Sequence, residues 1–100
     1  MNVVIRDLAF TVAGGAGEVT TLVGGPLHGL MTMVGVKAPN AAAPYDIQIY
    51  DAAGYLLYAE NDLIGDVTIS LEKICNSHIT LKLLNASVPG SYSARLYARG

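Results

Sequence analysis

The chain carries little charge, a single cysteine and no tryptophan. Charged residues make up 14% of its 100 residues, against about 25% in ordinary soluble domains. Because Cys75 has no second cysteine to pair with, the class of secreted mini-domains held together by intrachain disulfides is excluded. No apolar stretch approaches the ~20 residues of a membrane helix. The chain must therefore be stabilised by a hydrophobic core of its own.

Clustered positive charge is also lacking. The six Lys and Arg residues are scattered, the net charge is -2 and the pI is about 5.4. A nucleic-acid-binding face needs clustered cations, so no nucleic-acid partner is predicted. Met1–Arg6 does not have the basic start and following apolar run of a secretion signal. We therefore expect folding in a cytoplasm, and no membrane partner.

What the sequence does contain is apolar alternation near its C-terminal end. In His78–Asn85 every second residue is Ile or Leu, and in Ser91–Arg99 every second residue is Tyr, Ala or Leu. Ala86–Gly90, between them, has the composition of a turn. A period of two is typical of strands with one buried face. The two segments are predicted to form an antiparallel hairpin.

A second hairpin is predicted in the middle of the chain. Tyr45–Tyr50 alternates apolar and polar residues, and Tyr55–Glu60 is the expected return strand. Asp51–Gly54 between them is a turn, because Asp can bind the following backbone and Gly adopts positive φ.

Four further strands complete the expected fold. In Val3–Val12 the apolar residues change parity between Ile5 and Leu8, which predicts a bulge near Asp7. Seven or eight short strands with turns every 8–12 residues are typical of an antiparallel β-sandwich, of the jelly-roll or immunoglobulin-like kind. We expect one all-β domain over residues 1–100. The other three strands are predicted at Val19–Val23, Leu27–Val36 and Val67–Leu71. A helix is the less favoured alternative for Leu27–Val36, and Leu71, Ile74 and Cys75 also fit one helical turn.

The strand Leu27–Val36 is apolar at more positions than a one-sided sheet can bury. By alternation, Met31 and Met33 face one side, and Leu30, Val34 and Val36 face the other. With few charges to protect an exposed apolar face, we expect a partner chain to cover one of these two sets. The predicted protein interface therefore contains Leu30, Met31, Met33, Val34 and Val36, within a homo-oligomer or a larger assembly.

Six tyrosines raise a second possibility. Tyr45 shares the parity of Ile47 and Ile49 and is expected in the core, whereas Tyr50 lies on the opposite face. Exposed tyrosines can contact a protein partner, so Tyr50 and Tyr55 are added to the candidate interface. They also leave open a carbohydrate-binding or adhesion module that uses these rings as its platform.

No reaction is indicated by the remaining motifs. The loop Gly14–Gly17 leads into a β-like segment, so it lacks the helix N-terminus of a phosphate site. Cys75 and His78 offer two zinc ligands rather than four. A small hydrolase built on Cys75 and a histidine is the least favoured reading, because a lone cysteine beside an apolar strand is usually part of the core. The chain is expected to have no catalytic, metal-binding or cofactor-binding residues and no cofactor.

Four segments resemble a known class of proteins: Tyr45–Gly54, Tyr55–Tyr58, Ile79–Ala86 and Ala94–Arg99. Together they are similar to the small β-sandwich proteins of tailed bacteriophages that are encoded among the virion genes. The resemblance covers roughly residues 30–99. It implies a non-enzymatic structural subunit of the virion, as a head decoration, minor capsid or tail component, assembled in the host cytoplasm and docked on other virion proteins.

Overall fold

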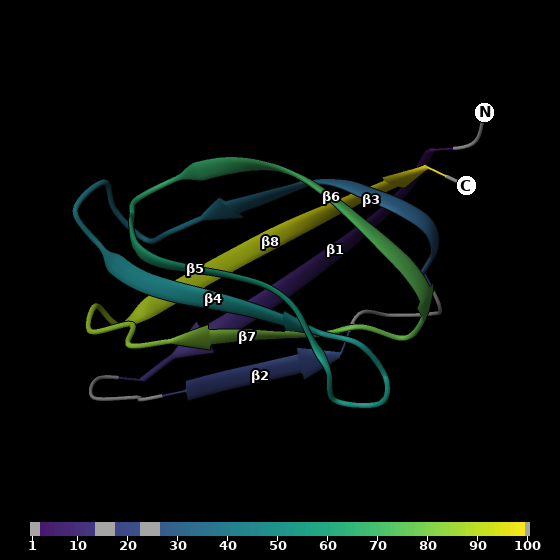
Figure 1. Ribbon diagram of the computed structural model, residues 1–100. Helices are drawn as coiled ribbons and strands as arrows, with labels where there is room; N and C mark the ends of the chain where they lie inside the picture. Colours follow the sequence, from purple (N-terminus) through teal and green to yellow (C-terminus); the bar gives the residue numbers. More distant parts are fainter. Residues whose placement is uncertain (1–2, 14–17, 23–26, 100) are drawn as a thin grey trace.

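The structure of the chain is a computed structural model that describes residues 3–13, 18–22 and 27–99. Over these residues it contains eight β-strands and no helix (Figure 1). In chain order the strands are β1 (Val3–Val12), β2 (Glu18–Leu22), β3 (Leu27–Lys37), β4 (Pro44–Tyr50), β5 (Leu56–Ile64), β6 (Val67–Ser77), β7 (Thr80–Leu84) and β8 (Gly90–Arg99).

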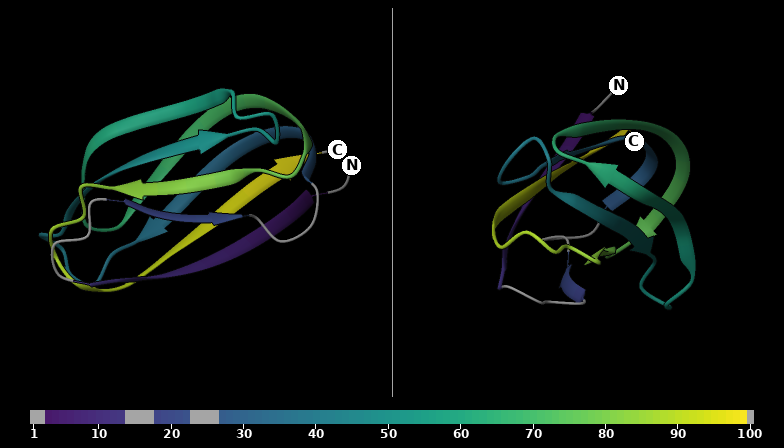
Figure 2. Two further views of the ribbon diagram at one scale, coloured as in Figure 1. Left: turned by 90° about the horizontal axis from the view of Figure 1, so that it is seen from below. Right: turned by 90° about the vertical axis from the view of Figure 1, so that its left-hand side faces the viewer.

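The strands form two four-stranded sheets that pack face to face (Figure 2). One sheet has the order β1-β8-β3-β6 and the other β2-β7-β4-β5, and every pairing is antiparallel. The first strand pairs with the last, the second with the seventh, the third with the sixth and the fourth with the fifth. This nested order, divided over two sheets, is that of a jelly roll. The predicted all-β antiparallel sandwich is confirmed.

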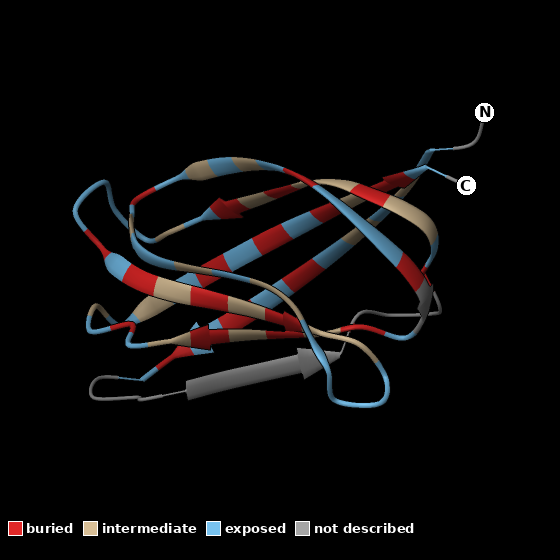
Figure 3. Ribbon diagram, viewed as in Figure 1, coloured by how far each residue is buried: buried red, intermediate tan, exposed pale blue. Residues whose placement is uncertain are grey.

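The core lies between the two sheets and is built by alternation along the strands. Buried residues alternate most regularly with intermediate or exposed ones along β4, β7 and β8 (Figure 3). Within the core the rings of Tyr45 and Tyr92 meet edge to face, with their centroids 5.8 Å apart, a favoured arrangement for aromatic pairs. The largest fully buried side chains are Tyr45, Tyr92, Leu27, Met31, Ile47, Ile49, Ile79, Leu81, Leu83, Leu96 and Val12.

The hairpin predicted in the middle of the chain is confirmed as β4–β5. Asp51 closes its turn in the expected way: Oδ1 accepts hydrogen bonds from the backbone N–H groups of Ala53 (3.0 Å) and Tyr55 (2.8 Å). Gly54 follows at φ +89°, where a side chain would be strained. The return strand runs on to Ile64, further than the predicted Glu60.

The hairpin predicted near the C-terminal end is wrong. β7 and β8 belong to opposite sheets, so residues 85–89 form an arch that crosses the core. The alternation correctly gave the inward faces, since Ile79, Leu81 and Leu83 are buried, as are Tyr92 and the inward residues after it. Alternation specifies which side of a strand is buried, however, and not which strand lies beside it.

Two other local predictions need correction. β1 pairs with β8 from Val3 to Val12 without a shift, so there is no bulge near Asp7. The change of parity arises because Val3 and Ile5 point outward. The strand predicted at Val67–Leu71 continues to Ser77 as β6. The predicted loop Gly14–Gly17 and the end of the predicted strand Val19–Val23 lie outside the described residues.

Tyr45 also fixes the turn between β5 and β6. Its hydroxyl donates a hydrogen bond of 2.6 Å to the carbonyl oxygen of Gly65. Gly65 has φ +67°, and a Cβ there would lie 2.8 Å from the carbonyl oxygen of Ala41. Glycine is therefore required at this point, where the chain passes from one sheet to the other.

Candidate protein interface

The candidate residues of β3 do not divide between the two faces of the strand as the alternation predicted. Met31, Val34 and Val36 are buried in the chain's own core. The register of β3 shifts between Met31 and Met33 against both neighbouring strands. Against β8 the extra residue is Thr32 of β3, whereas against β6 the extra residue lies in β6, between Ser70 and Lys73. Such a bulge reverses the parity that follows it. The prediction that Met31 and Met33 share a face is therefore wrong, and three of the five candidates belong to the core.

Leu30 and Met33 are the two candidates that lie on the outer face of the β1-β8-β3-β6 sheet. The register places Leu30 between Arg99 of β8 and Ile74 of β6. Met33 lies beside Tyr97 of β8, which in turn pairs with Ile5 of β1. Residues directly opposite in a ladder share one face of the sheet. Two neighbouring rows of this face are thus apolar at most positions.

The large exposed hydrophobic side chains of this sheet fall in the same two rows. Ile74 is 79% exposed, Val3 60% and Ile5 44%, while Leu30 and Met33 are partly exposed. We call these five residues, Val3, Ile5, Leu30, Met33 and Ile74, the outer apolar patch. Val3, Ile5 and Ile74 were not among the predicted interface residues. The change of parity in β1 was the signal for two of them, because it showed apolar residues on both faces of an edge strand.

Towards the opposite end of the strands the same face is polar. Nε and NH2 of Arg95 donate hydrogen bonds of 2.6 and 2.9 Å to the two carboxylate oxygens of Asp7. The hydrogen bond from Arg95 holds the pKa of Asp7 below its ordinary value of 3.8. Gly35 lies beside this pair. Because glycine has no side chain, a shallow depression of about 420 Å³ lies above Gly35, and Lys37 and Tyr97 border it.

The outer face of the β2-β7-β4-β5 sheet holds Tyr50 in a polar network. The Tyr50 hydroxyl donates a 2.6 Å hydrogen bond to Oε1 of Gln48. Nζ of Lys82 lies 4.9 Å from the centroid of the Tyr50 ring, within the range of a cation–π interaction. One side of the Tyr50 ring is therefore occupied within the chain. Tyr55, on the neighbouring turn, is 73% exposed, and Leu56 beside it is 53% exposed.

Asp46 connects three segments on the same face. Its Oδ1 accepts a hydrogen bond of 2.8 Å from the backbone N–H of Asp62, and its Oδ2 accepts one of 2.6 Å from Nδ2 of Asn85. Asp62 and Asn85 both have positive φ, 60° and 56°, a conformation that Asn and Asp tolerate better than other side chains. The carboxylate thus stabilises two strained backbone positions at once.

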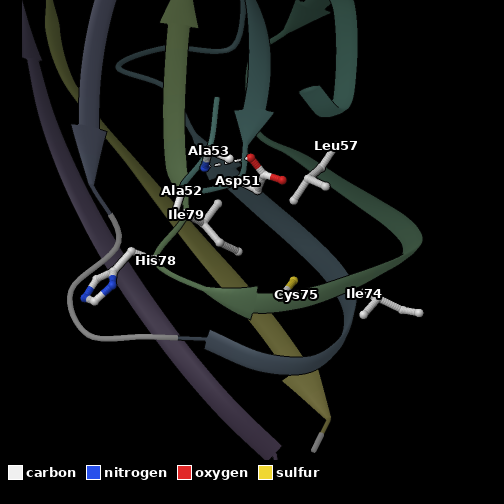
Figure 4. A pocket seen from close by; sticks show the side chains of 8 residues that line it. All are labelled: Asp51, Ala52, Ala53, Leu57, Ile74, Cys75, His78 and Ile79. Carbon is white, nitrogen blue, oxygen red and sulfur yellow. Dashed lines mark hydrogen bonds between the residues drawn. The ribbon is translucent and has the colours of Figure 1, made fainter. Parts of the chain in front are cut away.

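A pocket of about 250 Å³ lies at one end of the sandwich and contains the candidate cysteine (Figure 4). Cys75 is buried, its thiol donates a 3.5 Å hydrogen bond to the carbonyl oxygen of Lys73, and burial raises the pKa of the thiol. An activated nucleophile needs the opposite shift. In Figure 4 the ring of His78 points away from Cys75. This arrangement does not provide the thiolate and base of a cysteine hydrolase.

The described residues were also considered for metal binding and membrane spanning. No three His, Cys, Asp or Glu side chains among them are close enough to hold a metal ion together. Likewise, over residues 3–13, 18–22 and 27–99, no helix is long and apolar enough to cross a membrane.

Comparison with protein-family models and with curated proteins gives no match. Among solved structures, the chain is similar to the mitogen derived from Yersinia pseudotuberculosis, with 15% identity, a TM-score of 0.56 and coverage of 98% of this chain and 86% of the mitogen. FlhE is 10% identical with a TM-score of 0.48, and each chain is covered in full. A chain in the structure of infectious bursal disease virus, Gt strain, is 13% identical with a TM-score of 0.48. The match covers 99% of the present chain and 32% of the viral chain. The likeness to the mitogen supports the fold and nothing finer.

Proposed function

We propose that the chain is a non-enzymatic structural subunit of a tailed-bacteriophage particle, which docks on other protein chains through the outer apolar patch. As a virion component it acts as a decoration or minor capsid protein. The observation that carries the docking role is the patch itself: five apolar side chains in two adjacent rows of one sheet face, in a chain whose charged fraction is 14%. Contiguous exposed apolar surface typically marks a contact site.

The placement in a phage particle is supported by a different observation. It depends on the sequence resemblance of Tyr45–Gly54, Tyr55–Tyr58, Ile79–Ala86 and Ala94–Arg99 to phage β-sandwich proteins. The jelly-roll order of the strands is compatible with this class, because jelly rolls are used in capsids as well as in lectins.

A carbohydrate-binding module is the competing proposal, and the tyrosines support it less well. Sugar-binding platforms use aromatic rings exposed on one face. Here Lys82 lies over the ring of Tyr50, and the Tyr50 hydroxyl donates a hydrogen bond to Gln48. Of the two candidate tyrosines, Tyr50 and Tyr55, Tyr55 is therefore the one with a well-exposed ring.

The experiment is to purify particles made from the genome that encodes the chain and to detect the chain in them. Ile74→Glu, in the outer apolar patch, should lower its incorporation about tenfold or more, as a charge buried in a contact costs more than 1.4 kcal/mol. The matched control is Thr11→Glu, at an exposed position on the far part of β1, which should be incorporated normally. Absence of the chain from purified particles contradicts the proposal, and glycan binding that is lost in Tyr55→Ala supports the competing one.

A further inference from the structure

The pocket of about 250 Å³ adjoins the outer apolar patch. It lies between the edge strands of the two sheets, because Leu57 of β5 and Ile74 of β6 line it together with the β4–β5 turn. Ile74 is also a member of the outer apolar patch and is 79% exposed. A chain that covers the patch therefore also reaches the pocket.

Most of the pocket wall is apolar. Leu57, Ile74 and Ile79 contribute aliphatic side chains, and Cys75 contributes a buried thiol. His78 lines the pocket as well, with its ring pointing away from Cys75 (Figure 4). Walls of this kind suit a hydrocarbon segment, with orientation supplied by a few polar groups.

Asp51 supplies such a polar group. Its Oδ1 holds the β4–β5 turn, by accepting hydrogen bonds from the backbone N–H groups of Ala53 and Tyr55. Within residues 3–13, 18–22 and 27–99 no hydrogen bond or ion pair is made to its Oδ2. In Figure 4 this second oxygen points towards Leu57. The pocket thus offers one unused oxygen of a carboxylate, next to aliphatic walls.

We propose that the pocket receives a lysine side chain of the chain that docks on the outer apolar patch, with its ammonium group at Oδ2 of Asp51. This inference depends on the proposed function, because it states the chemistry of the partner at the proposed docking face. A lysine side chain combines a hydrocarbon stem with a compact cation, which matches the aliphatic walls and the single carboxylate. Arginine fits less well, since its planar guanidinium binds a carboxylate through both oxygens and Oδ1 already accepts two hydrogen bonds.

The first test uses n-butylammonium, which reproduces the end of a lysine side chain, and follows the isolated protein by NMR. It should move the amide signals of Asp51, Ala53 and Ile79, with a Kd of roughly 1–10 mM for so small a ligand. Asp51→Asn should weaken this binding about tenfold or more, because the negative charge is lost. An Asn oxygen can still accept the two hydrogen bonds of the turn, so the fold should be retained. Asp62→Asn is the matched control, because it removes a carboxylate at an exposed position outside the pocket and should bind as the wild type does.

Two further probes test the choice of a lysine. Butyrate has a similar stem and the opposite charge and should not bind, and n-propylguanidinium, the counterpart of arginine, should bind more weakly than butylammonium. Tighter binding of the guanidinium, or equal binding of butyrate, overturns the inference. So does equal butylammonium binding by Asp51→Asn and the wild type, or the absence of any signal change at about 100 mM, well above the expected Kd.

In purified particles the partner lysine is identified with a carbodiimide, which joins the Asp51 carboxylate to the lysine Nζ as an amide and takes up the water as a urea. Mass spectrometry should find Asp51 cross-linked to a lysine of another virion protein; cross-links from other carboxylates of the chain but none from Asp51 overturn the inference. Asp51→Asn should be incorporated about tenfold less than Asp62→Asn. Normal incorporation of Asp51→Asn together with reduced incorporation of Ile74→Glu overturns the lysine contact and leaves the proposed function standing. Absence of the chain from the particles overturns both.

Discussion

The two outer faces of the sandwich use their side chains in different ways. On the β2-β7-β4-β5 sheet, exposed polar groups are joined to one another: Tyr50 to Gln48 and Lys82, and Asp46 to the segments at Asp62 and Asn85. On the β1-β8-β3-β6 sheet, the five apolar side chains of the outer apolar patch share their two rows with Arg99 and Tyr97 of β8. The polar groups towards the other end of this face form an exposed ion pair.

The first face contributes to the stability of the chain itself, whereas the second face is the one proposed to bind a partner. Hydrogen bonds that hold strained backbone contribute to the free energy of folding. An exposed isoleucine contributes little to that free energy but gains when another protein covers it. Substitutions on the first face should therefore change stability, and substitutions on the second face should change association.

The largest expected effect compares the two methionines of β3. Met31→Asp places a carboxylate in the core, where the described residues include no buried polar or charged side chain to pair with it. It should lower the free energy of unfolding by more than about 3 kcal/mol. Met33→Asp, on the outer face, should leave the urea midpoint nearly unchanged and weaken association. Equal destabilisation by both variants would contradict the division of β3 at the Thr32 bulge.

Stability at alkaline pH should depend on Tyr45, which projects from β4 of the β2-β7-β4-β5 sheet into the core. Burial raises the pKa of Tyr45 from 10.0 to about 12, with smaller contributions from Asp66 and Tyr92. Between these values the unfolded chain loses the phenolic proton and the folded chain keeps it, so stability falls as pH rises. The loss for this fully buried group is about 2 kcal/mol across the window. Urea unfolding between pH 9 and 12 should show it, and Tyr45→Phe should reduce the slope; an unchanged slope in this variant would assign the loss to other groups.

The sequence predicted the fold class because each strand follows the alternation of a half-buried sheet. It predicted the β4–β5 hairpin because the Asp51–Gly54 turn is short and has specific turn residues. The same reasoning failed for β7 and β8, where an arch of residues 85–89 connects opposite sheets. Strand alternation contains no information on which sheet a strand joins, and a five-residue connection permits either outcome.

The faces on which the candidate interface residues lie were predicted only in part. Leu30 and Met33 lie on the outer face, but Met31, Val34 and Val36 do not, because the bulge at Thr32 reverses the parity of β3. Bulges depend on pairing with both neighbouring strands, which a single segment does not show. Val3 and Ile5 carried a visible signal in the change of parity of β1, and it was interpreted as a bulge rather than as exposed apolar surface.

A smaller effect is expected from the polar network of the β2-β7-β4-β5 sheet. Asp46→Ala removes the acceptor for the backbone N–H of Asp62 and for Nδ2 of Asn85, and should lower the free energy of unfolding by about 1 kcal/mol. Asp46→Asn keeps one acceptor oxygen and should cost less. Denaturant unfolding of both variants measures the difference. If Asp46→Ala were as stable as the wild type, this face would be no more involved in folding than the other.

The smallest effect concerns the ion pair on the other face. Asp7 and Arg95 are both well exposed, and exposed pairs contribute little to stability because water and salt screen them. Asp7→Asn should therefore leave the urea midpoint at pH 7 unchanged, in contrast to Asp46→Ala.

The pair should still be visible in titration, because the hydrogen bond from Arg95 lowers the pKa of Asp7. Followed by NMR, the Asp7 carboxyl should titrate below 3.8 in the wild type and return towards 3.8 in Arg95→Gln. A depressed pKa means that any contribution of the pair to stability is present above the ordinary value of 3.8 and disappears as the pH falls below it. An Asp7 midpoint that does not move in Arg95→Gln would mean that the two side chains do not pair in solution, and the polar end of this face would then offer an unpaired carboxylate and guanidinium to a partner.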